Sequence, residues 1–123
     1  KDTYKLYRKL GKAIGIITPI KGSGMRFTLS EKIIKFLVLS IIPPSSKLTV
    51  DTFINKLHDH FGIVIDRVHY KMEMDRGNVE KISSVTFMDK NKDAFVQKIK
   101  DCGFLRDLSD STSIIENPYS MEV

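Results

Sequence analysis

The sequence predicts a single α+β domain with a mostly helical core, short β-hairpins and an additional basic helix at its N-terminal end. The chain has 123 residues, which is within the usual size range of one domain. Hydrophobic residues make up 41% and charged residues 28%, a balance that is typical of folded globular proteins. Several segments place apolar residues at helical spacing, and short extended segments bounded by glycine or proline separate them.

The first predicted helix lies in the segment DTYKLYRKLGKAIGII and ends before Pro19. Its apolar residues follow Leu6 at i+4, i+7, i+8 and i+11, which predicts one buried stripe that reaches Ile17. Four cations occupy a separate face of this helix: Lys5, Arg8, Lys9 and Lys12. We therefore predict a basic surface at the N-terminal end of the chain.

The stretch TPIKGSGMRF follows this helix and combines two glycines with two cations, Lys21 and Arg26. A nucleotide-binding P-loop requires the order G-x-x-x-x-G-K-[ST]. Here Lys21 follows Ile20 and precedes Gly22, so the stretch does not fit a P-loop. We predict a hairpin turn between the short strands ITPI and MRFTL.

Two core helices follow the loop. Ser30 is a plausible N-cap for the segment 31–42, which is apolar on most of its circumference and is expected to be the central buried helix. The short extended pair KL leads to Thr49, which is expected to cap a helix over 50–61, and Gly62 is expected to end that helix. This helix should pack its apolar face on the one before it.

The second half of the chain begins with a segment of mixed pattern, 63–90. Alternating apolar residues in it would suit a hairpin, whereas its later apolar residues could lie along a helix, and we expect it to be rich in helix. Asn91 is expected to cap a helix over 92–102, which ends at Gly103. A strand, a polar turn and a second strand then occupy 104–116.

The order of these elements resembles the winged-helix superfamily over residues 28–119, preceded by the basic helix and loop of 1–27 and followed by a tail, 120–123. The stretch AFVQKIKDCGFLRDLSDSTSIIENP, in which a helix runs into a hairpin, carries the resemblance. The resemblance implies that helix 92–102 is a recognition helix that enters the DNA major groove and that 109–113 is the tip of a wing. The distance between the second and third predicted helices exceeds the turn of a helix-turn-helix, so an insertion or an additional helix is expected between them.

Charge is concentrated at one end of the chain. The net charge is +5, but residues 1–26 hold seven cations against one anion (+6), and the remaining residues hold 13 cations against 14 anions (−1). This asymmetry predicts attachment to an anionic partner, with nucleic acid, and DNA in particular, as the first choice. The predicted nucleic-acid-binding residues are Lys5, Arg8, Lys9, Lys12, Lys21, Arg26, Lys92, Lys98 and Lys100.

A protein-interaction or oligomerisation module is the alternative function. Helix 92–102 mixes cations with carboxylates, which are unfavourable beside phosphates, so specific base reading by this helix is not predicted. The same mixture of charges suits a docking surface, together with the tyrosines Tyr4 and Tyr7. Other domains or subunits of a larger assembly would then be the partners.

Enzymatic chemistry is not predicted, and neither is a metal or a cofactor. His58 and His60 are two residues apart, so on a helix they point about 200° apart, and we expect both at the surface or its boundary. His69 could join them only if the fold gathers these residues, and Cys102 is expected to pack in the core. Four acidic residues lack metal-ligand spacing: Asp66, Glu73, Asp75 and Glu80.

The sequence predicts a cytoplasmic protein. It has a single cysteine and no segment with the pattern of a signal peptide. Its longest apolar run, 33–42, is shorter than the roughly 20 residues that cross a bilayer, so no contact with a membrane is predicted. Because the first residue is Lys1, we expect the chain to be part of a longer protein.

Overall fold

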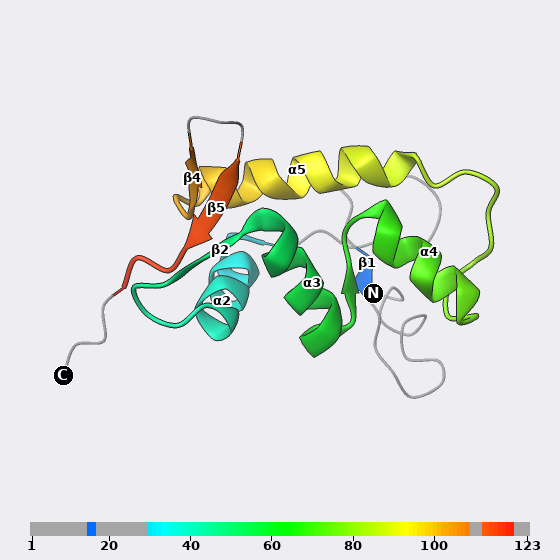
Figure 1. Ribbon diagram of the computed structural model, residues 1–123, viewed down its shortest axis with the longest axis horizontal. Helices are drawn as coiled ribbons and strands as arrows, with labels where there is room; N and C mark the ends of the chain where they lie inside the picture. The colour runs from blue at the N-terminus through cyan, green and yellow to red at the C-terminus, as the bar shows by residue number, and fades with distance from the viewer. Residues whose placement is uncertain (1–14, 17–29, 109–111, 120–123) are drawn as a thin grey trace.

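The computed structural model describes residues 15–16, 30–108 and 112–119. In these residues four helices and two small sheets form a mostly helical α+β fold, which confirms the predicted fold class and is compatible with a winged helix (Figure 1). The predicted N-terminal helix and hairpin loop, the wing tip and the C-terminal tail lie wholly or mostly outside the described residues.

One part of the N-terminal prediction can be corrected. Gly15–Ile16, which we expected within the first helix, form the short strand β1. This strand pairs in parallel with β3, Ile63–Val64, with Gly15 opposite Ile63. Glycine is a poor helix former, and the backbone hydrogen bonds of this pairing outweigh the weak helical preference of the segment.

Helix α2, Glu31–Ile41, begins at the predicted cap, because Ser30 Oγ accepts a hydrogen bond from the backbone N–H of Ile33 at 3.2 Å. Its buried face consists of Ile34, Leu37 and Val38. The opposite face is exposed to solvent: Ile33 (41% exposed), Phe36 (59%) and Leu39 (38%). The expectation that this is the central buried helix is therefore wrong, since the described neighbouring elements cover only one side of it.

Helix α3, Val50–Phe61, has the caps that the sequence predicts. Thr49 Oγ1 accepts from the N–H of Thr52 at 3.2 Å, and Gly62 ends the helix in the left-handed conformation, with φ 71°. A positive φ is unfavourable for residues with a Cβ atom, which explains the glycine at this position. The buried face of α3 lies at the centre of the domain and contains Val50, Phe53, Ile54, Leu57 and His58.

The expected hairpin forms a three-stranded antiparallel sheet with the extended pair KL. Its strands are β2 (Lys47–Thr49), β4 (Leu105–Asp107) and β5 (Ser113–Glu116), in the order β2-β5-β4. The central strand β5 places Ile115 opposite both Leu48 and Leu105. The predicted strands of this sheet are thus confirmed, and β2 pairs with the last strand, β5.

The segment between α3 and the last helix contains one further helix. Helix α4, Arg67–Asp75, agrees with the helix-rich expectation and is the additional helix that was one of the two alternatives for this spacing. The later apolar residues of the segment, including Val79 and Val85, lie in a loop and pack against Tyr70 and Met88, so the expectation of a helix there is wrong.

Helix α5, Phe87–Asp101, starts earlier than predicted. Asn91 is inside the helix and fully buried, where its Nδ2 donates to the carbonyl of Ile65 at 2.6 Å. The predicted N-cap at Asn91 is therefore wrong: its side chain bonds across the core to the segment before α4 and does not cap its own helix. Gly103, with φ 88°, forms the turn after the helix as expected.

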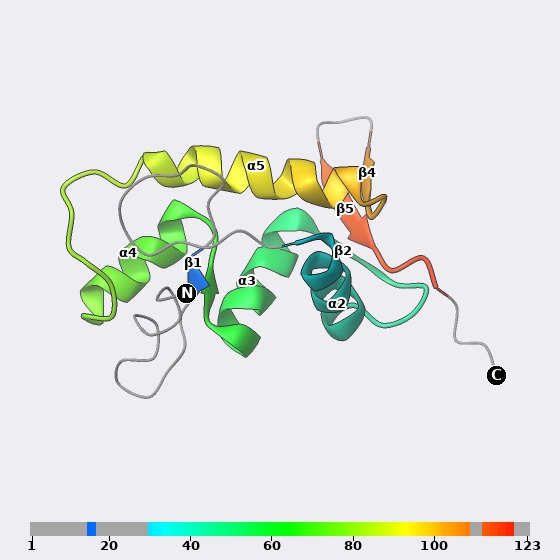
Figure 2. The same ribbon diagram turned by 180° about the vertical axis from the view of Figure 1, so that it is seen from behind.

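Helix α5 runs along the whole domain and connects its two ends. Figures 1 and 2 show the three-stranded sheet at the C-terminal end of α5 and helix α4 at its N-terminal end. The main core lies under the C-terminal half of α5 and includes the stacked rings of Phe53 and Phe95, with centroids 6.4 Å apart. A smaller apolar cluster around Tyr70 and Met88 joins α4 to the N-terminal half.

Candidate functional site

The described part of the chain contains three of the predicted nucleic-acid-binding residues, all on α5. Lys92 Nζ lies 3.1 Å from Asp51 Oδ1, and Lys100 Nζ lies 3.6 Å from Asp107 Oδ2. Lys98 is half-buried and makes no ion pair with a described residue. The other six lie outside the described residues: Lys5, Arg8, Lys9, Lys12, Lys21 and Arg26. Two of the three observable cations are therefore already neutralised by the domain itself.

The outward face of α5 carries an acidic row. Asp89, Asp93, Gln97 and Asp101 are all exposed and recur every four residues, so they line one side of the helix. Gln97 Nε2 donates to Asp101 Oδ1 at 2.9 Å, and Arg67 lies 3.1 Å from Asp89. A row of carboxylates on this face is unfavourable beside DNA phosphates.

The hairpin after α5 adds further carboxylates. Asp107 Oδ1 accepts a hydrogen bond from Ser113 Oγ at 2.7 Å, and this bond, together with the charge of Lys100, holds the pKa of Asp107 below its ordinary value. Arg106 pairs with Glu116 across the two strands at 2.5 Å. The hairpin therefore stays anionic or neutralised at neutral pH and offers a phosphate little attraction.

A buried polar pair connects α3 with α4. His58 Nε2 lies 2.5 Å from Glu73 Oε2, and the two residues are only 8% and 3% exposed. The expectation that His58 lies at the surface or its boundary is wrong. Its position explains the burial, because His58 follows Ile54 by four residues and continues the apolar face of α3.

Glu73 is held by donors from three directions. Asn78 Nδ2 donates to its Oε1 at 2.8 Å, and Arg76 donates to its Oε2 at 3.1 Å, beside the contact from His58. Burial raises the pKa of Glu73, but the hydrogen bonds from Asn78 and His58 and the charge of Arg76 outweigh it and leave the pKa below its ordinary value. Glu73 is therefore a buried carboxylate that stays ionised at neutral pH.

A second histidine lies against the first. His69, 5% exposed, is held by Asp66, whose Oδ1 accepts from the His69 ring nitrogen Nδ1 at 2.6 Å and from its backbone N–H at 3.1 Å. The second of these bonds makes Asp66 the N-cap of α4. The ring centroids of His58 and His69 are 4.5 Å apart. The fold thus brings together two histidines that are 11 residues apart in the chain.

Cys102 does not join these histidines. It lies at the C-terminal end of α5 and packs against the main core, as the sequence predicts, although it is only half-buried. Burial and the carboxylates of Glu31 and Asp101 raise the pKa of its thiol. The thiol therefore remains protonated at neutral pH, which makes it a poor nucleophile.

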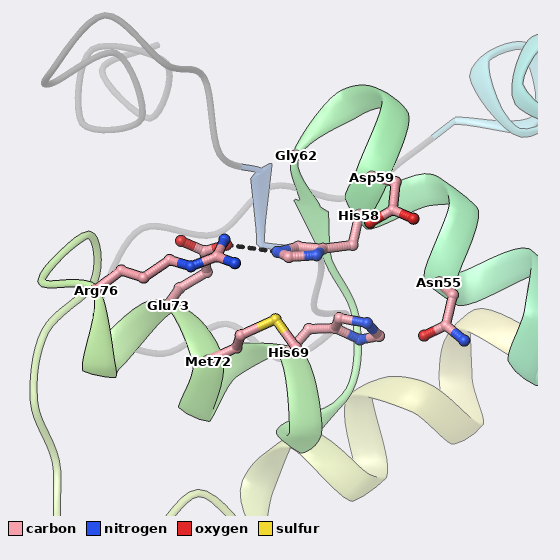
Figure 3. Close-up of a pocket in the computed structure, with 8 residues that line it drawn as sticks. All are labelled: Asn55, His58, Asp59, Gly62, His69, Met72, Glu73 and Arg76. Carbon is pink, nitrogen blue, oxygen red and sulfur yellow. Dashed lines mark hydrogen bonds and ion pairs between the residues drawn. The ribbon is translucent and has the colours of Figure 1, made fainter.

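The two histidines line a pocket of about 370 Å³ between α3 and α4. Figure 3 shows their rings one above the other, and the dashed line from Glu73 reaches the nitrogen of His58 that points away from Asn55. The lining residues are Asn55, His58, Asp59, Gly62, His69, Met72, Glu73 and Arg76. Within the described ranges, no group of three or more His, Cys, Asp or Glu side chains has a geometry suited to a metal ion.

The sequence reasoning missed this pocket because its polar residues follow apolar spacing. His58 occupies an i+4 position after Ile54, and Glu73 follows the buried Tyr70 by three residues, so each one lies on the inward face of its helix. The available signal was a position in the apolar spacing of each helix that is occupied by a polar residue, histidine in α3 and glutamate in α4. The pairing itself depends on how α3 and α4 meet, which local spacing does not specify.

None of the helices in the described residues combines the length and the apolar composition that a membrane crossing requires.

Comparisons with known proteins identify a family. No curated protein and no solved structure is significantly similar to the chain. A family model described as methylation-associated defense system protein MAD7 matches residues 14–119, which is most of the chain. The chain therefore belongs to the MAD7 family of methylation-associated defense system proteins.

Proposed function

We propose that this domain is a non-catalytic nucleic-acid-binding module of a defense-system protein, built as a winged helix, and that its ligand is DNA. The observation that carries the proposal is the topology. Helix α2, strand β2 and helix α3 are followed, after the inserted β3 and α4, by helix α5 and a hairpin, and strand β2 pairs with the last strand β5. This order of elements is the one that suggested the winged-helix resemblance in the sequence.

Charge indicates which surface makes the contact. The acidic row of α5 and its paired lysines argue against groove reading by this helix. Residues 1–26 carry a net charge of +6, whereas the rest of the chain is nearly balanced. We infer that the basic N-terminal segment binds the phosphate backbone and that Lys98, the predicted α5 lysine without an ion pair to a described residue, assists it. Such contacts supply affinity without base specificity.

A salt titration tests this proposal. Binding of labelled duplex and single-stranded DNA is measured by fluorescence anisotropy at several salt concentrations, for the wild type and for a variant with alanine at Lys5, Arg8, Lys9 and Lys12. Each lost phosphate contact removes about 0.9 from the slope of log K against log salt, so the slope should fall by roughly 3 to 4 units. Lys98→Ala should lower it by about one unit.

The matched control removes lysines of the same kind elsewhere. Lys71 and Lys81 are exposed, lie on α4 and on the loop after it, and are not among the predicted binding residues. The Lys71→Ala/Lys81→Ala variant should keep the wild-type slope. The proposal is wrong if the wild type does not bind DNA at low salt, or if the control variant loses as much slope as the N-terminal one.

The exposed face of α2 favours a second candidate function, self-association. Ile33, Phe36 and Leu39 form an apolar row at helical spacing on the outside of the domain. Such a row is typical of helices that pack against another protein surface. If α2 is an oligomer contact, light scattering should detect a concentration-dependent dimer that Phe36→Asp abolishes and that the N-terminal alanine variant leaves unchanged. A wild type that stays monomeric at all concentrations contradicts this candidate.

A further inference from the structure

The paired histidines between α3 and α4 share an unusual arrangement. In each ring one nitrogen is held by a carboxylate: Nε2 of His58 by Glu73 at 2.5 Å, and Nδ1 of His69 by Asp66 at 2.6 Å. Histidines that bind metal ions almost always donate their other ring N–H to a carboxylate, a backbone carbonyl or water, and such a contact fixes the tautomer and orients the ring. Each of these two histidines therefore has the kind of contact that orients a metal-binding histidine.

The second nitrogen of each ring has no protein partner in the described residues. His58 Nδ1 and His69 Nε2 make no hydrogen bond there. They are not sealed off either, because Asn91 Oδ1 is the one unpaired side-chain nitrogen or oxygen that is fully enclosed in the described part of the chain. Since both histidines line the pocket and are more than nine-tenths buried, these nitrogens open into the pocket itself.

The tautomer of each neutral ring follows from the carboxylate that it contacts. A carboxylate that is ionised can only accept a hydrogen bond, so the imidazole nitrogen that faces it carries the proton. In the neutral ring the other nitrogen then holds a lone pair. When both rings are neutral, Nδ1 of His58 and Nε2 of His69 are therefore the nitrogens that carry the lone pairs.

We propose that this pocket binds a divalent transition-metal ion such as Zn²⁺ through Nδ1 of His58 and Nε2 of His69. Imidazole nitrogen is a preferred ligand of such ions, at about 2.0–2.1 Å. If two rings bind one ion and the N–metal–N angle lies between a right angle and the tetrahedral angle, this distance places the ring centres roughly 4.5–5.2 Å apart. The observed separation of 4.5 Å lies at the lower end of that range.

The charges around the pocket favour a cation over an anion. Asp59 and Glu73 line it and Asp66 lies behind His69, whereas Arg76 is the one Lys or Arg among the lining residues and is paired with Glu73. With two protein ligands, water completes the coordination. An open site of this kind can exchange its ion and can accept a group from a bound partner, unlike a closed structural zinc site.

The test uses the full chain and Zn²⁺ alone. Isothermal titration calorimetry measures affinity, and long-range ¹H–¹⁵N NMR of the imidazole nitrogens identifies the ligating atoms. Zn²⁺ should shift Nδ1 of His58 and Nε2 of His69. His69→Gln should remove the binding. Asp66→Asn keeps a side chain that caps α4 well but replaces the carboxylate, and it should weaken Zn²⁺ binding roughly 10–100-fold.

His60 provides the matched control, because it is exposed on the same helix two residues from His58. His60→Ala should bind Zn²⁺ with the wild-type affinity. The proposal is overturned if Zn²⁺ shifts His60 alone, if Asp66→Asn binds as tightly as the wild type, or if the wild type shows neither heat nor NMR shifts at millimolar Zn²⁺. Should His69→Gln fail to fold, Asp66→Asn and the wild-type spectra still decide between these outcomes.

Discussion

The two ends of helix α5 hold the domain together by different means. At its C-terminal end, α2, α3 and the three-stranded sheet enclose an apolar core around Phe53 and Ile115. At its N-terminal end, α4 joins the domain through a small apolar cluster and through the polar pair of His58 and Glu73. An apolar core tolerates substitutions between apolar side chains of similar volume, whereas a buried polar pair is stable only when both partners are present. The N-terminal end should therefore depend more on single polar groups.

The largest effect should come from the apolar core. Phe53 is fully buried and stacks on Phe95, so Phe53→Ala removes a large apolar side chain and leaves a cavity. The free energy of unfolding should fall by about 4 kcal/mol, as measured by urea denaturation. Phe36→Ala, which truncates the same side chain on the exposed face of α2, is the control and should change it by less than about 0.5 kcal/mol. Equal losses in both variants would contradict the assignment of the core.

The polar end should respond nearly as strongly to the loss of a single carboxylate. Glu73→Ala leaves His58 and Asn78 without their acceptor in a buried place, and the unfolding free energy should fall by roughly 3 kcal/mol. Glu80→Ala, an exposed carboxylate on the following loop, should have little effect. A small change in Glu73→Ala would mean that the pair contributes little to stability and that apolar contacts alone hold α4.

Acid should remove stabilisation from the polar end of the domain, where Glu73 lies. The pKa of Glu73 is lower in the folded chain than its ordinary value of 4.5, so the unfolded state binds the proton first. The stabilisation by this carboxylate is complete at neutral pH, declines as the pH falls below about 4.5, and is lost as the pH passes the folded pKa. Chemical denaturation of the metal-free chain should show the wild type and Glu73→Gln converging in stability over this range. A constant difference between them across the range would contradict the lowered pKa.

The same contrast explains what the sequence could and could not predict. Caps depend on residues close in the chain, so Ser30, Thr49 and Gly62 were correctly placed from local pattern alone. Asn91 also resembles a local cap, but the carbonyl of Ile65, 26 residues earlier, captures its side chain. His58 and Glu73 likewise find each other only after α3 and α4 meet. The polar end of the domain, which includes the candidate metal site, is therefore specified by long-range pairing that residue spacing does not encode.

The burial of α2 shows a different limit. Its apolar residues cover most of the circumference, and the sequence cannot indicate which of them the rest of the domain will reach. The buried face follows Ile34, Leu37 and Val38, while Phe36 projects to solvent. Hydrophobic periodicity thus identifies the helix but overestimates its burial when the described elements cover only one side of it.

The smallest predicted effect compares two threonines that precede helices at the two ends. Thr49 Oγ1 accepts from the N–H of Thr52, whereas Thr86, before α5, makes no capping bond with its side chain. Thr49→Ala should lower the free energy of unfolding by about 1 kcal/mol, and Thr86→Ala by no more than a few tenths. Urea denaturation with an unchanged m-value would measure both. A larger loss in Thr86→Ala would show that α5 depends on a cap after all, whereas the expected order indicates that its buried contacts, such as those of Met88 and Asn91, hold its start in place.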